Sequence, residues 1–260
     1  MLGSFLGKFY HDVIGRIFGI DALIEKRLPG LIRQEIDAAL LAFARGESGG
    51  RGLTLDVDQT ARFLASVSSA EFFLKHMRMS RNTILAESLL EFALKQCVVD
   101  GLVMEFGVFR GKSLRIIADR TAQTVFGFDS FEGLPEDWDN AQKKGQFSLA
   151  GVAPRFEQSN VTLVPGWFEH TLPKFLAENP GPARFVHVDA DIYSAAVTIL
   201  TALRGRIVPG TVIQFDEYFN YPGWEHHEFK AFEEFIRDTG LRFEYLGFAS
   251  SQSAVAVKII

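Results

Sequence analysis

From residue 101 onward, short apolar runs alternate with segments that have the spacing of amphipathic helices. The runs with the length and composition of buried strands are 102–106, 124–128, 161–164, 184–188, 211–215, 241–247 and 254–259. Helical patterns at 111–120, 168–178, 193–204 and 225–238 separate most of them. Strands that alternate with helices predict an α/β fold with a doubly wound, mostly parallel sheet. Only a short turn, 248–253, joins the last two strands, so the final strand is predicted to be antiparallel to its neighbour.

The composition excludes several classes of protein. The chain has 260 residues, a hydrophobic fraction of 47% and a net charge of −5, which leaves no basic excess for binding nucleic acid. Cys97 is the only cysteine, so neither an intrachain disulfide nor a cysteine-based zinc site can form. No apolar run approaches the roughly 20 residues of a membrane span. A reducing, cytoplasmic location is therefore expected.

The first hundred residues read as helical, with apolar faces in 1–20 and 31–45 and further helices at 57–66, 69–78 and 82–97. A linker rich in glycine and polar residues is expected at 47–52. We therefore predict a helical N-terminal extension over 1–80 and a sheet domain over 81–260. The apolar faces need a surface on which to bury, so the extension is expected to cover the site or to form a homo-oligomer. Attachment of the first helix to a membrane surface is the alternative.

Acidic residues follow the predicted strands at the edge where such sheets bind ligands. Glu105 lies near the end of the first strand, which leads through Gly107 and Gly111 into a helix, and this turn lets the backbone approach a ligand closely. Asp129 closes the second strand, where a carboxylate can accept the hydroxyl hydrogens of a ribose. A role for Asp129 as a helix cap or turn former is the plainer alternative.

Five segments of the chain carry a resemblance to a known family. They are EFGVFRG (105–111), GFDSFEGLP (127–135), PGWFEHTLP (165–173), HVDADIY (187–193) and FDEY (215–218). In this order they resemble the class I S-adenosylmethionine-dependent methyltransferases, and more closely the macrocin O-methyltransferase-like group that modifies sugars on natural products. The resemblance covers roughly residues 80–260. It implies a Rossmann-like, seven-stranded sheet with an antiparallel last strand, which agrees with the strand pattern.

The resemblance also implies which residues bind S-adenosylmethionine. The methionine end of the cofactor would lie near Glu105, Phe106, Gly107, Phe109, Gly111 and Ser113. Asp129, with Ser130 and Phe131 beside it, would hold the ribose. Gly166 and Trp167 would lie near the adenine, although Trp167 could equally be a core aromatic residue.

Carboxylates at the ends of the fourth and fifth strands predict a metal site. These strands should be neighbours, so Asp189, Asp216 and Glu217 can converge as oxygen ligands for a hard ion such as Mg²⁺. The family usually has two aspartates after the fifth strand, so Glu217 either ligates or turns away. Asp189 is also expected to contact the cofactor, and Asp189 and Asp216 to act in catalysis.

Histidines supply the candidates for a general base. His226, beside His227 at the start of the last helix, is the predicted catalytic histidine, and a solvated helix start is the alternative. His187 shares a strand face with Asp189 and is expected to be a packed, hydrogen-bonded core histidine. Asp191 is expected to support the ligands or to cap a helix.

Together these features predict an S-adenosylmethionine-dependent O-methyltransferase, assisted by Mg²⁺, that acts on a hydroxyl of a sugar or glycosylated small metabolite. One alternative is a glycosyltransferase whose Asp189 and Asp191 grip a metal and a nucleotide sugar, but it leaves Glu105 and Asp129 without a purpose. A second alternative is a non-catalytic assembly partner that retains cofactor binding.

Overall fold

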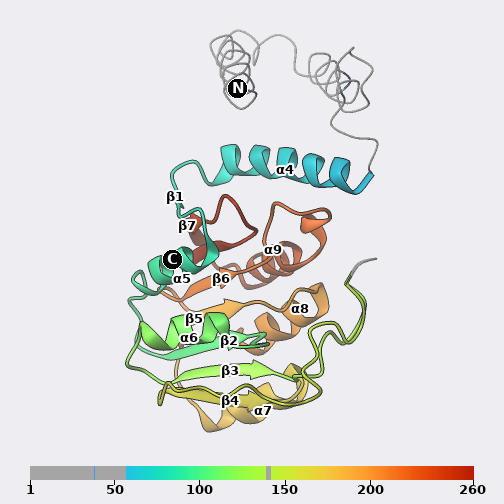
Figure 1. Cartoon of the computed structure of the whole chain (residues 1–260). Coiled ribbons are helices and arrows are strands. Elements are labelled where there is room, and N and C mark those ends of the chain that lie inside the picture. The colour runs from blue at the N-terminus through green and yellow to red at the C-terminus, as the bar shows by residue number, and fades with distance from the viewer. Residues whose placement is uncertain (1–37, 39–56, 139–141) are drawn as a thin grey trace. The chain divides into compact units, whose positions relative to one another are not determined.

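A computed structural model of the chain describes residues 38, 57–138 and 142–260 (Figure 1). The chain divides into two units, Met1–Ala61 and Arg62–Ile260, and the domain boundary predicted between residues 80 and 81 stays a prediction. The helices predicted at 1–20 and 31–45 and the linker at 47–52 lie outside the described residues. No helix within the described ranges has the length and apolar character needed to cross a membrane.

The second unit is built on one mixed sheet in which eight strands have the order β1-β7-β8-β6-β5-β2-β3-β4. Their bounds are Arg81–Asn82 (β1), Leu102–Phe106 (β2), Val125–Asp129 (β3), Val161–Pro165 (β4), Ala183–Val188 (β5), Val212–Phe215 (β6), Phe243–Phe248 (β7) and Val255–Ile259 (β8). All neighbours are parallel except β8, which is antiparallel to both β6 and β7. The predicted fold class is confirmed, and the two-residue β1 is an addition at one edge.

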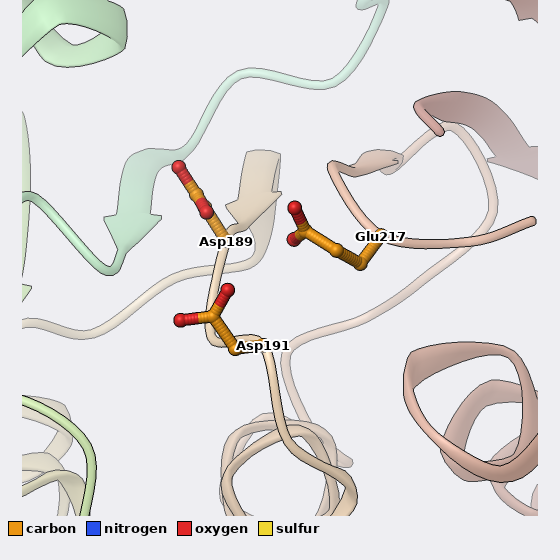
Figure 2. A group of neighbouring side chains, drawn as sticks. All are labelled: Asp189, Asp191 and Glu217. Atoms are coloured by element: carbon orange, nitrogen blue, oxygen red, sulfur yellow. The ribbon is translucent and has the colours of Figure 1, made fainter. Parts of the chain in front are cut away.

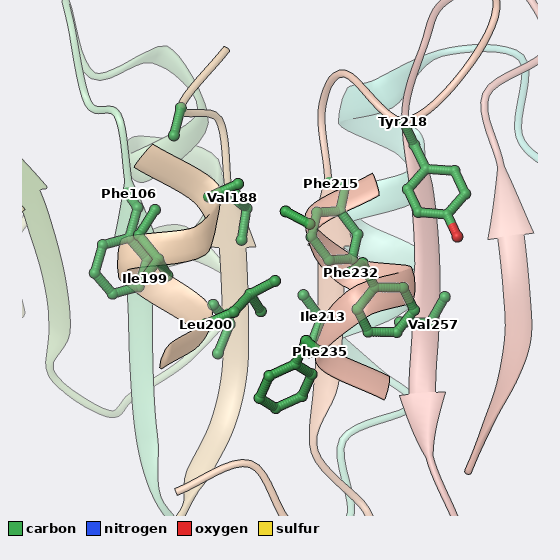
Figure 3. Packing of buried hydrophobic residues seen from close by; sticks show 14 of the residues in the cluster. Phe106, Val188, Ile199, Leu200, Ile213, Phe215, Tyr218, Phe232, Phe235 and Val257 are labelled. Atoms are coloured by element: carbon green, nitrogen blue, oxygen red, sulfur yellow. The ribbon is translucent and has the colours of Figure 1, made fainter. Parts of the chain in front are cut away.

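Helices cover both faces of the sheet. They are α4 (Val57–His76), α5 (Ala86–Leu94), α6 (Lys112–Asp119), α7 (Phe168–Glu178), α8 (Tyr193–Ala202), the 3-10 turn η1 (Trp224–His226) and α9 (Glu228–Thr239). Alternate residues of β2 point to opposite faces. Phe106 therefore enters the core formed with α7, α8 and α9, and Val103 enters the core formed with α5 and α6. Figure 3 shows the first core, where Ile199, Phe232 and their neighbours pack against the sheet.

Helix α4 is continuous where the sequence pattern predicted two helices. Within the helix, the Ser68 hydroxyl donates to the Ala65 carbonyl (3.1 Å). This serine and the next one also hold the loop after β6, because Ser69 Oγ accepts the Asn220 N–H (2.8 Å) and Ser68 Oγ accepts the Trp224 indole N–H (3.0 Å). Helix α4 is therefore part of the support for that loop.

The loops that follow β2 and β5 diverge above the middle of the sheet. The chain passes from β2 into α6 on one face and from β5 into α8 on the other, although the two strands are paired neighbours. At the point of divergence Gly107 has φ 92°, and a Cβ there would lie 1.7 Å from the Asp189 carbonyl oxygen. Only glycine permits this approach. The crevice created by such a divergence is where doubly wound sheets bind ligands.

Candidate functional site

A cavity of about 550 Å³ opens at the carboxyl ends of the central strands. Residues from the predicted cofactor set that line it are Gly107, Phe109, Asp129, Ser130, Gly166, Trp167 and Asp189. The cavity extends along the start of α8 past Ser194 and Thr198, and Asp191 and Glu217 lie on its wall. One cavity thus joins the predicted cofactor region to an acidic region.

Asp129 organises the loops on the cofactor side of the cavity. Its Oδ2 accepts the Val108 N–H (2.9 Å) and the Phe109 N–H (2.7 Å), and its Oδ1 accepts the Phe131 N–H (2.7 Å). Phe109 and Phe131 have φ of 45° and 58°, a backbone region that residues other than glycine rarely adopt. An ionised carboxylate can accept about four hydrogen bonds. Asp129 therefore holds two strained loops and keeps acceptor capacity for a ligand.

Other members of the predicted cofactor set lie behind the cavity wall. Phe106 stacks on Phe128 in the core, with ring centroids 4.7 Å apart, and Phe131 is buried. Gly111 has φ 74° and lies against the ring of Phe156, which a Cβ would approach to 2.3 Å. These residues shape the loops from beneath and do not line the cavity.

Glu105, Ser113, His187 and Asp216 lie next to one another beneath the loops. Ser113 Oγ donates to Glu105 Oε1 (2.6 Å), Glu105 Oε2 lies 3.9 Å from His187 Nδ1, and His187 Nε2 lies 3.8 Å from Asp216 Oδ1. Burial opposes a charge on His187, but Asp216 and Glu105 outweigh it and raise the pKa of this imidazole. His187 is buried as predicted, but the predicted hydrogen bonds are not found: neither ring nitrogen has a hydrogen-bond partner among the described residues, and the imidazole lies between the carboxylates of Glu105 and Asp216.

Asp189, Asp191 and Glu217 form the acidic cluster of the site. Their carboxylate oxygens lie within 4.8 Å of one another, and Glu217 extends toward the loop that carries the two aspartates (Figure 2). Burial and the neighbouring Asp216 raise the pKa of Asp189 and of Glu217 well above the ordinary range. Burial, Asp216 and Asp129 raise the pKa of Asp191 to about 7. Such crowding of like charges favours binding of a proton or a cation.

The composition of the acidic cluster differs from the predicted metal set of Asp189, Asp216 and Glu217. Asp191, which has φ of 61°, lies with Asp189 and Glu217, while Asp216 lies beside His187, so the role of Asp216 as a ligand stays a prediction. Glu217 reaches the cluster, and its buried Oε2 has no hydrogen-bond partner. Of the two alternatives for Glu217, the structure shows the side chain turned toward the cluster.

The predicted catalytic histidine lies away from this geometry. His226 is exposed on η1 and does not line the cavity. The adjacent His227 packs against Trp138 and Tyr221, with ring centroids 6.0 and 6.1 Å apart. His226 therefore lies outside the cavity lining, and its predicted role as a base stays a prediction.

Sequence reasoning missed Glu228, the first residue of α9. It is fully buried, and its oxygens accept the Ala190 N–H (3.2 Å) and the Glu217 N–H (3.1 Å). Helical spacing offered a signal, since Glu228 shares the buried face of α9 with Ala231, Phe232 and Phe235.

Comparison with known proteins identifies relatives of this domain. Residues 104–218 match the family model described as a methyltransferase domain. The chain is 30% identical over 156 residues to the 8-demethyl-8-(2,3-dimethoxy-alpha-L-rhamnosyl)-tetracenomycin-C 4'-O-methyltransferase of Streptomyces olivaceus, covering 50% of this chain and 58% of that protein. It is 30% identical over 145 residues to the mycinamicin III 3''-O-methyltransferase of Micromonospora griseorubida, covering 46% and 56%. The chain thus spans less than two thirds of the length of these relatives.

Two solved structures share the fold. The calicheamicin methyltransferase CalS11 superposes with a TM-score of 0.52 at 20% identity, over 80% of this chain and 98% of that one. The O-methyltransferase NovP superposes with a TM-score of 0.50 at 22% identity, over 66% and 78%. These likenesses establish the architecture of the sheet and its helices.

Proposed function

We propose that the protein is an S-adenosylmethionine-dependent O-methyltransferase, because residues 104–218 match the family model described as a methyltransferase domain. Its acceptor would be a hydroxyl of a sugar or glycosylated small metabolite. The observation that carries the proposal is that one cavity joins Asp129, suited to a ribose, to a cluster of three carboxylates suited to an acceptor hydroxyl. The names of the two relatives, both O-methyltransferases of glycosylated compounds, agree with it.

The cofactor would bind over Gly107, with its ribose hydroxyls donating to Asp129. Phe109 and Trp167 offer apolar walls in the same cavity lining as Asp129. Glu105 and Ser113 lie beneath the loop, so their contribution to the methionine end is to fix the backbone that the cofactor touches. The proposed cofactor site is thus formed by Asp129 and loop backbone, supported by buried polar residues.

The acidic cluster fits a divalent cation. Asp189, Asp191 and Glu217 offer hard oxygen donors, and the buried Glu217 Oε2, which has no hydrogen-bond partner, is free to contact a cation. These three residues would hold Mg²⁺, which when bound lowers the pKa of a coordinated hydroxyl and orients it. The site therefore has the chemistry for Mg²⁺-assisted transfer to an alcohol.

Asp191 is the proposed acceptor of the hydroxyl proton, in place of His226. It lines the cavity, and when one of its carboxylate oxygens holds the cation the other is left to accept a proton from the coordinated hydroxyl. In the transfer, a new bond forms between the acceptor oxygen and the methyl carbon while the bond from that carbon to sulfur breaks. The hydroxyl proton passes to Asp191, and S-adenosylhomocysteine leaves.

Calorimetric titration with S-adenosylmethionine and a nucleotide sugar, each with Mg²⁺ or EDTA, tests the proposal. Binding of S-adenosylmethionine, followed by release of S-adenosylhomocysteine with glycosylated acceptors, is the expected result. Binding of the nucleotide sugar alone would instead indicate a glycosyltransferase. Cofactor binding without turnover on any acceptor in a broad panel would favour an assembly partner. A cytoplasmic location and a homo-oligomeric state remain predictions from the sequence.

A further inference from the structure

We propose that Glu228 is a positioning residue that sets the geometry of the acidic cluster. Glu228 has 0% of its surface exposed and does not line the cavity, so it acts through other residues. The inference rests on the proposed function, because the cluster formed by Asp189, Asp191 and Glu217 is taken as the cation site.

The two oxygens of Glu228 join the two loops that carry the cluster. Oε1 accepts the N–H of Ala190, the residue between Asp189 and Asp191, at 3.2 Å. Oε2 accepts the N–H of Glu217 itself at 3.1 Å. A single carboxylate thus bridges the loop after β5 and the loop after β6. The separation of these backbones, and with it the separation of the ligand oxygens, depends on the length and acceptor capacity of this one side chain.

The bridge is anchored in the core of the protein. Glu228 begins α9, whose Ala231, Phe232 and Phe235 are buried against the sheet. The next residue, Phe229, packs edge-on against Phe72 of α4, with ring centroids 5.3 Å apart. Because the helix is held in this way, the carboxylate is a fixed reference to which both loops are attached.

The chemistry of the bridge requires two acceptors. In Glu228→Gln the shape is kept, but the amide NH₂ group is a donor and cannot accept a backbone N–H. One of the two loops therefore loses the acceptor for its N–H, which then points at the NH₂ group. In Glu228→Asp both acceptors remain, but the side chain is one methylene shorter and cannot span both loops. Either change should displace one part of the cluster relative to the other while leaving all three ligand side chains present.

The test compares the wild type, Glu228→Gln, Glu228→Asp and the matched control Glu233→Gln, an exposed glutamate on the same helix. Mn²⁺ binding is measured by electron paramagnetic resonance, S-adenosylhomocysteine binding by calorimetry and folding by thermal unfolding. We expect Mn²⁺ affinity to fall about 10- to 100-fold in both Glu228 variants. The control should match the wild type, and S-adenosylhomocysteine affinity should stay within about twofold of it, since Glu228 lies outside the cavity.

The outcomes separate this inference from the proposed function. Unchanged Mn²⁺ affinity in a folded Glu228 variant would overturn the positioning role and leave the cation site standing. Absence of Mn²⁺ binding by the wild type would overturn the proposed cation site and this inference with it. If Glu228→Gln does not fold, Glu228→Asp decides the matter by the same criterion. If both fail to bind S-adenosylhomocysteine, Glu228 supports the whole fold, and the specific role is refuted.

Discussion

Asp129 makes three backbone hydrogen bonds before any ligand is present, so its replacement should have two separable effects. We expect Asp129→Ala to weaken cofactor binding about 10- to 100-fold, because the ribose loses its acceptor and two strained loops lose their anchor. The free energy of unfolding should fall by about 1–3 kcal/mol. Calorimetry with S-adenosylhomocysteine and chemical denaturation measure the two effects. Asp238→Ala, an exposed aspartate on α9, is the control. An unchanged dissociation constant would remove Asp129 from the cofactor site.

Asp191 offers the sharpest single-residue test of the proposed reaction. Asp191→Asn keeps the size of the side chain, but the neutral amide can neither accept the hydroxyl proton nor contribute a charge to the cluster. Turnover should fall about 10²- to 10⁴-fold, while S-adenosylhomocysteine binding stays close to that of the wild type. Single-turnover assays with a competent acceptor measure the first quantity, and calorimetry measures the second. Turnover within a factor of two of the wild type would assign the proton to another group.

The sequence predicted that carboxylates gather at the site, but it predicted less well which carboxylates lie together. Asp189 and Glu217 were expected in the cluster and lie there, because strand ends are predictable from apolar runs. Asp191 lies in the cluster and Asp216 lies beside His187, although the sequence predicted Asp216 as a ligand and Asp191 as a supporting or capping residue. A single sequence does not show either contact.

At the level of elements, Gly107 tests how closely the loops after β2 and β5 must approach. A methyl group in Gly107→Ala would meet the Asp189 carbonyl at 1.7 Å, and φ of 92° is itself unfavourable for alanine. The free energy of unfolding should fall by about 2–4 kcal/mol, with weaker binding of S-adenosylhomocysteine. Gly205→Ala is the matched control, because open space surrounds that position. Equal unfolding midpoints in the two variants would show that the loops can separate without cost.

Strands proved more predictable than helix boundaries. Each predicted strand appears within two residues of its expected limits, because uninterrupted apolar runs bounded by turns are characteristic of buried parallel strands. The helix predicted from residue 82 begins instead at Ala86, because Arg81 and Asn82 pair with β7. That pairing joins segments more than 160 residues apart, and local sequence patterns do not report such contacts.

For the whole molecule, the acidic cluster predicts how stability depends on pH. The pKa of Asp191 is about 7 in the folded protein against an ordinary value of 3.8, so between these values the folded state holds a proton that the unfolded chain has released. Raising the pH through this window therefore lowers the free energy of unfolding. The raised pKa values of Asp189 and Glu217 act in the same direction.

Thermal unfolding in EDTA and in Mg²⁺, at about pH 5 and about pH 8, measures this dependence. In EDTA the wild type should lose more stability across the range than Asp191→Asn, which carries no titrating group at that position. Mg²⁺ should raise the unfolding temperature more at the higher pH, because cation binding requires deprotonated ligands. A Mg²⁺ effect that is equal at both pH values would contradict the assignment of these carboxylates as ligands.

The position of β8 bears on how the protein is made. β8 is the last strand in chain order, yet it lies between β6 and β7 and is the strand through which β7 and β1 join the sheet. While a ribosome is still adding residues 249–259, the fully buried β6 has an open edge with unpaired backbone groups. Such an edge is a template for pairing with other chains. During synthesis, the edge of β6 is therefore open to pairing with other chains until Val255–Ile259 pairs with it.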